Sequence, residues 1–179
     1  YAVTKLSSVR NGNEQTLVIG KREGAYKDMP LARPFKVKVL SSLIPQSVTV
    51  NGHPAKYHYS GEDFALLIDV PAQACDQEKV VKIVYPSEKV DLNGLLGASR
   101  RIAKSMEQLK YRNSYIVFKE EFGKMGSLSE AVTYAPSEMP ALIADFWKSY
   151  NELPAVLERQ GMKSDLATWF LQSVCWSKR

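Results

Sequence analysis

The spacing of apolar residues changes near residue 90, and this change constrains the fold more than any other feature of the sequence. Before residue 90, apolar and polar residues alternate in short runs that are separated by turn-forming residues. After it, apolar residues recur every three or four positions. The first spacing is that of strands with one buried face, and the second is that of helices with one buried stripe. The sequence therefore predicts the α+β class, with an antiparallel β-sandwich at 1–90 and an α-helical region at 91–179.

Six or seven short strands are predicted in the first half. Asn11-Gly12 and Asn51-Gly52 each separate two β-rich runs, and such dipeptides favour the left-handed backbone of a tight hairpin turn. Pro71 and Pro86 end the last two runs, because proline cannot donate to a strand ladder. Short strands at this density are typical of a sandwich. The predicted strands are Val3–Val9, Thr16–Ile19, Phe35–Leu40, Ser47–Val50, Ala55–Tyr59, Phe64–Val70 and Val80–Tyr85.

The second half is predicted to begin with a long amphipathic helix. Asp91 and Asn93 precede it, and both residue types are favourable N-caps. The segment 115–122 fits either a strand, from its β-branched and aromatic residues, or an exposed helix, from its charged end. The apolar stripe of the first helix comprises Leu95, Leu96, Ile102, Met106 and Leu109.

Four local signals divide the rest of the second half. The segment Ser127–Glu130 has the pattern of a capping box at the start of a short helix. Ser137 is predicted to cap the next helix, and Pro154 predicts a kink or a fresh start within it. Gly161 should end that segment, and Ser164 should cap a last helix that carries Cys175 in an apolar stretch.

The charge of the chain is spread along it. There are 24 basic and 19 acidic residues, so the formal net charge is +5, and both halves contribute to the excess. Nucleic-acid binders gather their basic residues on one stripe or arm, and the densest cluster here, Lys36 and Lys38, alternates with apolar residues as on the solvated face of a strand. No apolar run has the roughly 20 residues of a membrane span. We therefore expect neither a nucleic-acid partner nor a membrane span.

Most catalytic and metal-binding patterns are missing. The only histidines, His53 and His58, lie beside a predicted turn, and the only cysteines, Cys75 and Cys175, are 100 residues apart. Two unrelated thiols are favoured over a disulfide, and such a set offers little for a metal cluster. No phosphate-binding loop is present, and the carboxylate pairs at 62–63 and 120–121 have the pattern of solvated surface. We predict no catalytic, cofactor-binding or metal-binding residue.

Two tyrosines are candidates for a sugar contact. Tyr57 and Tyr59 alternate in one predicted strand, so their rings share a face, and aromatic rings can stack on the apolar side of a sugar. Cross-strand packing is the favoured alternative for both rings. The tryptophans on the helical stripes, Trp147 and Trp169, are expected to fill a core.

The most distinctive stretch is the loop from Gly20 to Arg33. Its glycines permit positive φ angles, and Pro30 should stiffen the return of the chain. Charge-assisted bonds from the arginines to the nearby carboxylates Glu23 and Asp28 could close the loop. The residues that define the motif are Gly20, Arg22, Glu23, Gly24, Tyr26, Met29, Pro30 and Arg33.

This motif resembles the C-terminal β-sandwich of glycoside hydrolase family 31, which includes α-glucosidases and α-xylosidases, often from gut Bacteroidetes. The segment Pro45–Gly52 is similar to a second stretch of that sandwich, a strand followed by a turn, and comes in the same order. The resemblance covers about residues 1–86, while the helical part resembles, in general pattern only, tails appended to some bacterial members.

The resemblance implies a scaffolding role outside the catalytic centre. In this family the catalytic carboxylates lie on an upstream (β/α)8 barrel, and no residue here matches that catalytic motif. The barrel of the parent chain is the implied partner, and the helical region could contact a neighbouring subunit. The parent would be a retaining α-glycosidase that is periplasmic or otherwise exported. We interpret the early start of the alternating pattern, just after Tyr1, as the mark of a piece of a longer protein. A carbohydrate-binding module and a stand-alone structural domain are the alternatives.

Overall fold

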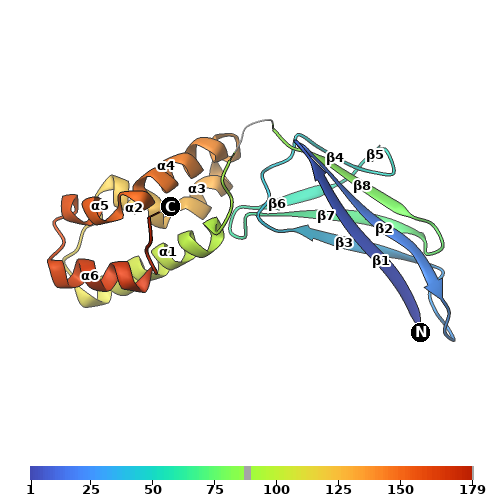
Figure 1. Ribbon diagram of the computed structural model, residues 1–179, viewed down its shortest axis with the longest axis horizontal. Coiled ribbons are helices and arrows are strands. Elements are labelled where there is room, and N and C mark those ends of the chain that lie inside the picture. The colour runs from blue at the N-terminus through green and yellow to red at the C-terminus, as the bar shows by residue number, and fades with distance from the viewer. Residues whose placement is uncertain (87–89, 179) are drawn as a thin grey trace. The chain divides into compact units, whose positions relative to one another are not determined.

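The computed structural model describes residues 1–86 and 90–178 (Figure 1). These residues fall into two compact units, one formed by 1–60 and 64–86 and the other by 61–63 and 90–178. Strands make up the first unit and helices the second, so the α+β class is confirmed. Among the described residues, no helix combines the length and the apolar character needed to cross a bilayer.

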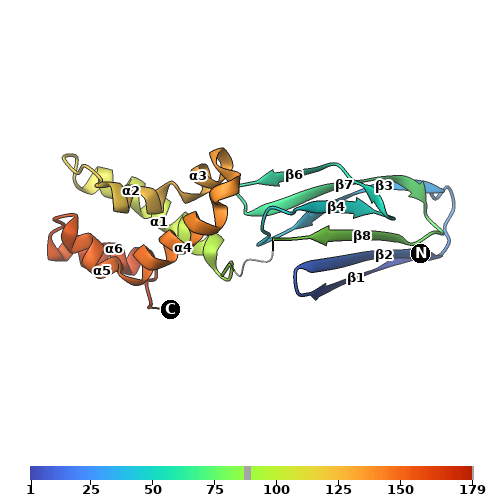
Figure 2. The ribbon, with the colours of Figure 1, turned by 90° about the horizontal axis from the view of Figure 1, so that it is seen from above.

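The first unit is an antiparallel sandwich of two sheets (Figure 2). One sheet has five strands in the order β1-β2-β8-β4-β5, and the other has three in the order β3-β7-β6. The strands are β1 (Ala2–Asn11), β2 (Glu14–Gly24), β3 (Ala32–Val39), β4 (Ser47–Val50), β5 (His53–Pro54), β6 (Tyr57–Ser60), β7 (Ala65–Ala74) and β8 (Lys79–Val84).

The core of the sandwich lies between the two sheets. On β8, Val81 and Ile83 are completely buried, whereas Lys82 between them points to solvent. On β7 of the opposite sheet, Ile68 and Val70 are likewise buried. The period of two that predicted the strands is therefore the period at which side chains enter this core.

Both predicted hairpins form, with different turns. In the β4–β5 hairpin, Asn51 and Gly52 have φ angles of 50° and 81°, which is the pattern of a type I′ turn. In the β1–β2 hairpin, Asn11 pairs with Glu14, and only Gly12 of the two central residues has a positive φ, as in a type II′ turn. Both turn types match the right-handed twist of paired strands.

The predicted strand Ala55–Tyr59 is wrong, because the chain changes sheets within it. The short strand β5 ends at Pro54, and its last hydrogen bond to β4 is the one of 2.9 Å that the Ala55 N–H donates to the carbonyl of Val48. The chain then crosses to the other sheet, where β6 pairs with β7 from Tyr57 onward. The strand that was predicted at Thr16–Ile19 also differs, since β2 extends from Glu14 to Gly24.

The second unit contains six α-helices and one short 3₁₀-helix among its described residues. The segment 115–122 is a loop through Lys119, so the strand alternative is wrong, and only its charged end is helical, where α2 begins at Glu120. Pro154 does mark a fresh start, at a new helix that begins at Leu153. The helices are α1 (Leu95–Arg112), α2 (Glu120–Gly126), α3 (Leu128–Tyr134), η1 (Pro136–Glu138), α4 (Met139–Asn151), α5 (Leu153–Arg159) and α6 (Ser164–Ser173).

The predicted side-chain caps of these helices do not form. The backbone of Ser127 has a ψ of 16° rather than the extended value of an N-cap, and its hydroxyl donates back to the carbonyl of Gly123. Ser137 lies within η1, and Ser164 is the first residue of α6, after its N-cap Lys163. From α2 through η1 the chain passes almost directly from helix to helix, so few residues there can adopt the extended backbone that capping needs. Before α6 that backbone is present, but Lys163 occupies it rather than a serine.

The start of the first long helix also differs in detail. Gly94 is the N-cap of α1, with a φ of 69°. Asp91 acts one turn earlier, where its Oδ1 accepts a hydrogen bond of 2.9 Å from the backbone N–H of Asn93. The predicted N-cap residues therefore shape the approach to the helix rather than its first turn.

Aromatic rings form much of the helical core. Phe122 and Phe170 are buried, and their ring centroids are 5.2 Å apart. Phe146 stacks on Tyr150 one turn further along α4. Trp147 is only partly buried, and its indole N–H donates to the carbonyl of Asp91 at 2.7 Å. These contacts confirm that the apolar stripe of α4 faces a core. Trp147 and Trp169 were predicted to fill a core, but both are only half-buried and lie at its margin.

Candidate functional site

The family-motif loop connects the two sheets of the sandwich at one end. It starts on the last residues of β2, passes through 25–31 and ends on the first residues of β3. A β-bulge lies within the motif, because Thr4 pairs with Arg22 whereas Leu6 pairs with Ile19. At this bulge a Cβ on Gly20 would lie 3.1 Å from the carbonyl oxygen of Lys5, so glycine allows the strands to approach closely.

Backbone hydrogen bonds hold both arms of the loop to the turn after β7. The N–H of Arg22 donates to the carbonyl of Cys75 at 2.7 Å, and the N–H of Cys75 donates to the carbonyl of Leu31 at 2.8 Å. Gly24 has a φ of 86°, which favours glycine at the point where the loop leaves β2. Residue 75 thus bridges the arms through its backbone, while its thiol is buried and free.

The predicted carboxylate clamp is wrong. The Arg22 guanidinium donates to the backbone carbonyl of Pro30 at 2.5 Å, so it holds the loop through a neutral acceptor. Glu23 lies on the other side of the strand, where it pairs with Lys5 at 3.3 Å. Asp28 forms no ion pair with any residue that the structure describes.

A small cavity of about 100 Å³ lies inside this end of the sandwich. Five motif residues line it, and three do not: Glu23, Gly24 and Met29. The strands and the turn after β7 supply the remaining walls. The lining residues are Ala2, Thr4, Gly20, Arg22, Tyr26, Pro30, Arg33, Phe35, Cys75 and Lys79.

The sequence analysis missed Lys79, the most buried charged residue of the cavity. It is only 1% exposed, and its Nζ donates to the carbonyls of Ala74 and Gln77, both at 2.7 Å. The alternation of β8 could have revealed it, since a period of two places residue 79 on the same face as the core residues Val81 and Ile83.

Tyr57 and Tyr59 share one face of β6, as predicted, and this face is the inner one. Their register partners on β7 are Ile68 and Leu66, two core residues. The Tyr59 hydroxyl donates to the carbonyl of Ser42 at 2.8 Å, and burial raises the pKa of that hydroxyl. Tyr57 is 41% exposed, so any sugar contact would use part of its ring, and that contact stays a prediction.

Tyr85 forms a second buried hydroxyl contact in the sandwich. Its hydroxyl donates to Oε1 of Gln15 at 3.0 Å and lies 3.1 Å from the Ser42 hydroxyl. Burial raises its pKa, and this effect outweighs the opposing contact with Ser42 and the positive charge of Arg10. These groups link both sheets through directional bonds.

The described residues contain no group of histidines, cysteines and carboxylates that could hold a metal ion. His53 and His58 are exposed on β5 and β6. Glu120 and Glu121 pair with the surface cations Lys124 and Arg159, at 2.6 and 2.8 Å. The Lys124 ammonium lowers the pKa of Glu120, which is the opposite of what a general acid near neutral pH requires.

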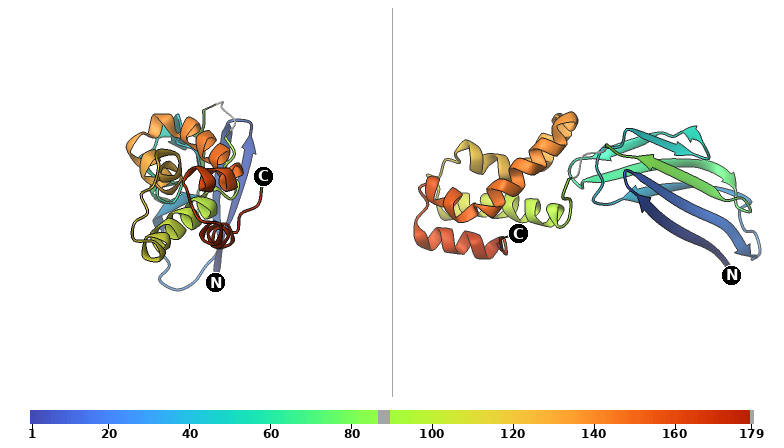
Figure 3. Two further views of the ribbon diagram at one scale, coloured as in Figure 1. Left: turned by 90° about the vertical axis from the view of Figure 1, so that its left-hand side faces the viewer. Right: turned by 45° about the horizontal axis from the view of Figure 1, so that its top comes forward.

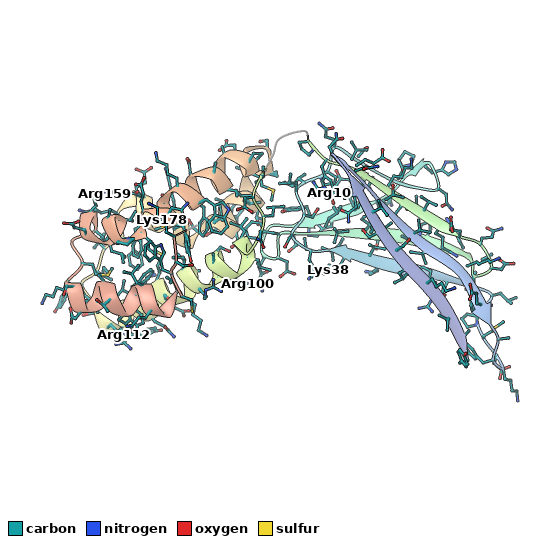
Figure 4. The ribbon with its side chains drawn as sticks, in the orientation of Figure 1. Arg10, Lys38, Arg100, Arg112, Arg159 and Lys178 are labelled. Atoms are coloured by element: carbon teal, nitrogen blue, oxygen red, sulfur yellow. The ribbon has the colours of Figure 1, made fainter. Side chains whose placement is uncertain are left out.

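Basic side chains outside the cavity lie on several elements of each unit (Figure 4). Arg10 on β1 covers the ring of Tyr85 at 4.7 Å, and Arg112 on α1 covers the ring of Trp169 at 4.3 Å. In both of these cation–π contacts the charged group lies against a ring of its own unit.

Cys175 is free and exposed. The prediction that it lies in an apolar helical stretch is therefore wrong: α6 ends before it, and its φ is 51°.

Comparison with known proteins gives a partial likeness to a solved structure. No protein-family profile matches the chain, and no curated protein matches it. A Flavobacterium johnsoniae GH31 dextranase, solved as a D412A mutant in complex with isomaltotriose, is similar at 17% identity and a TM-score of 0.41. The likeness covers 46% of this chain and 12% of that chain, so this chain spans a small part of the dextranase's length. A likeness with so low an identity and TM-score carries no functional inference for this chain.

Proposed function

We propose that this chain is a non-catalytic accessory region from the C-terminal part of a family 31 glycoside hydrolase. Its parent would hydrolyse α-glycosidic bonds by the two-carboxylate retaining route, with the reacting carboxylates on a barrel outside this chain. One observation carries the proposal: the two sequence motifs form one end and one hairpin of a single antiparallel sandwich. Five of the motif residues line a small cavity there, and the Arg22 side chain donates to the backbone carbonyl of Pro30, as expected of residues that build a scaffold.

The exposed apolar side chains of β1 support a scaffolding role. Val3, Leu6 and Val9 are 44%, 71% and 63% exposed, on a strand that has a neighbour on one side only. Figure 3 (right) shows this strand in dark blue at the border of its sheet. Free edges are usually protected by charges or covered by another element, and apolar residues at such an edge favour a covered one. The barrel of the parent would cover β1.

The helical unit also exposes large side chains. Tyr111, Tyr115 and Tyr134 are at least 80% exposed, as is Val117. Aromatic residues are enriched where proteins contact one another, so these residues would serve a neighbouring domain or subunit of the parent. Export of the parent to the periplasm or beyond is part of the same proposal, and fractionation of cells that express the whole protein would test it.

Two measurements test the proposal. The purified chain, incubated with aryl α-glucosides, aryl α-xylosides and isomalto-oligosaccharides, should release no product, and turnover that survives repurification would overturn the non-catalytic role. The coding sequence ahead of Tyr1 should encode a (β/α)8 barrel with paired carboxylates at its strand ends. A different fold there would overturn the family assignment even if the chain were inactive.

A further inference from the structure

We propose that the cavity at the motif end of the sandwich binds one compact oxyanion, a carboxylate, sulfate or phosphate group. This site is independent of the catalysis assigned to the parent. It lies between the ends of β1, β2 and β3 and the turn after β7, and its cationic walls are Arg22, Arg33 and Lys79. The inference depends on the charge of the walls, the burial of one lysine and the size of the space.

The charges of the cavity are unbalanced. Three cationic side chains line it, and no aspartate or glutamate does. The nearest carboxylate along the motif, Glu23, pairs with Lys5 instead. A recess with charges of one sign and low-dielectric walls concentrates its potential, and here that potential attracts an anion.

The burial of Lys79 makes the excess of positive charge in the cavity energetically unfavourable. Its side chain is almost completely buried, and lysines are rarely buried unless they are paired with an opposite charge. The carbonyls of Ala74 and Gln77 accept two of its three N–H bonds, but neither carries a full negative charge. No residue that the structure describes forms an ion pair with it. An anion in the cavity would supply the missing charge.

The other lining groups provide donors that suit an oxyanion. Arg33 lies over the ring of Phe35, 4.9 Å from its centroid, which orients the guanidinium while leaving its N–H groups available. Arg22 uses one N–H for the Pro30 carbonyl and has further donors on the same planar group. Tyr26 adds a hydroxyl at the wall, and its side chain is about half exposed, so the cavity is reachable from solvent.

The size of the cavity limits the ligand. About 100 Å³ is several times the roughly 10–15 Å³ that a single water needs. A carboxylate has three heavy atoms and a sulfate or phosphate has five, so each fits, whereas a whole sugar ring with its substituents would leave most of its atoms outside. The anion is therefore either a free inorganic ion or the charged group of a larger organic molecule.

Titration of the intact chain with sodium sulfate, sodium phosphate and sodium glucuronate, each against sodium chloride at equal ionic strength, tests the proposal. Calorimetry should show saturable binding of at least one anion, and amide spectra should show shifts centred on Arg22 and Cys75. Arg33→Gln should weaken binding at least tenfold. Lys36→Gln removes the same charge from the same strand outside the cavity and should leave binding unchanged. Lys79→Met should weaken binding as Arg33→Gln does.

The outcomes distinguish the sources of the anion. Tighter binding of glucuronate than of sulfate and phosphate indicates an organic carboxylate, and the reverse order indicates an inorganic ion. Because Lys79→Met could prevent folding, the exposed Arg33 provides the decisive variant. A response that does not saturate, or that Arg33→Gln and Lys36→Gln change equally, would overturn the site.

Discussion

The two units are stabilised in different ways. The sandwich contains directional polar contacts inside its core, among them the Tyr59 and Tyr85 hydroxyls and the buried ammonium of Lys79. The helical unit also has a partly buried hydrogen bond, between Ser173 and Ser105, but much of its core consists of closely packed rings such as Phe122 and Phe170. Removing one atom is enough to eliminate a hydrogen bond. The packing of rings is weakened only when a substitution removes side-chain volume. The units should therefore respond to different substitutions.

The largest effect is expected from removing a ring from the helical core. Phe170 is completely buried, so Phe170→Ala should lower the free energy of unfolding of this unit by about 3–5 kcal/mol. Tryptophan fluorescence follows this unit alone, because all three tryptophans, at 147, 169 and 176, belong to it. Tyr115→Ala is the matched control at a residue 93% exposed and should change stability by less than about 0.5 kcal/mol. Equal effects of both variants would contradict the packing argument.

A smaller loss of stability is expected from removing a single hydroxyl oxygen, and it should differ between the two units. Tyr85→Phe removes a buried hydroxyl that bonds Gln15 and lies beside Ser42, so it should cost about 1–3 kcal/mol. Tyr150→Phe in the helical core is the counterpart, because no hydrogen bond of its hydroxyl is found among the described residues, and it should cost less than about 0.5 kcal/mol. Amide exchange of β8 and α4 measures the two losses separately. Equal costs would remove the distinction between the units.

The pH response should likewise belong to the sandwich. Burial raises the pKa of Tyr59 above the ordinary value of about 10, so the unfolded chain loses this proton first. The stabilising contribution is therefore complete below pH 10 and is lost as the pH rises further. Tyr59→Phe should cost about 1 kcal/mol at pH 8, through its bond to Ser42, and should reduce the alkaline loss. Urea unfolding followed by strand circular dichroism at pH 8 and pH 11 checks both.

Ile68→Val is the control for this pH response. It shortens a buried apolar side chain of the same core and should cost about 0.5–1.5 kcal/mol to the same extent at both pH values. An unchanged alkaline loss in Tyr59→Phe would show that another group causes it.

The sequence predicted the elements of both units well where the signal was periodic. Alternation marked the strands of the sandwich, and the steps of three and four residues marked α1 and α4. Turn dipeptides located both hairpins, because glycine and asparagine accept backbone angles that other residues avoid. The capping predictions failed because they depended on single residues: Ser127 and Ser137 have the right side chains for capping but not the extended backbone, which depends on how neighbouring helices meet.

The cavity shows a different limit of sequence analysis. The motif from Gly20 to Arg33 was visible as an ordered loop, but its cavity also needs Phe35 and Lys79, which come from β3 and β8. Sequence spacing cannot reveal that strands far apart in the chain end at the same place. The exposure of Leu6 was also hidden, since an alternating strand looks alike whether or not a second sheet covers it.

The smallest effect on this chain is expected at β1, and it bears most directly on the proposed function. Leu6→Ser and Val9→Ser change residues that are 71% and 63% exposed, so each should alter the stability of the chain by less than about 0.5 kcal/mol. In the whole parent protein, the same substitutions would place a hydroxyl against the barrel and should cost more than 1 kcal/mol each. Leu31→Ser, at a residue 80% exposed in the motif loop, controls for the loss of an apolar side chain. Thermal unfolding of both proteins measures the contrast, and equal effects in chain and parent would show that β1 is not covered.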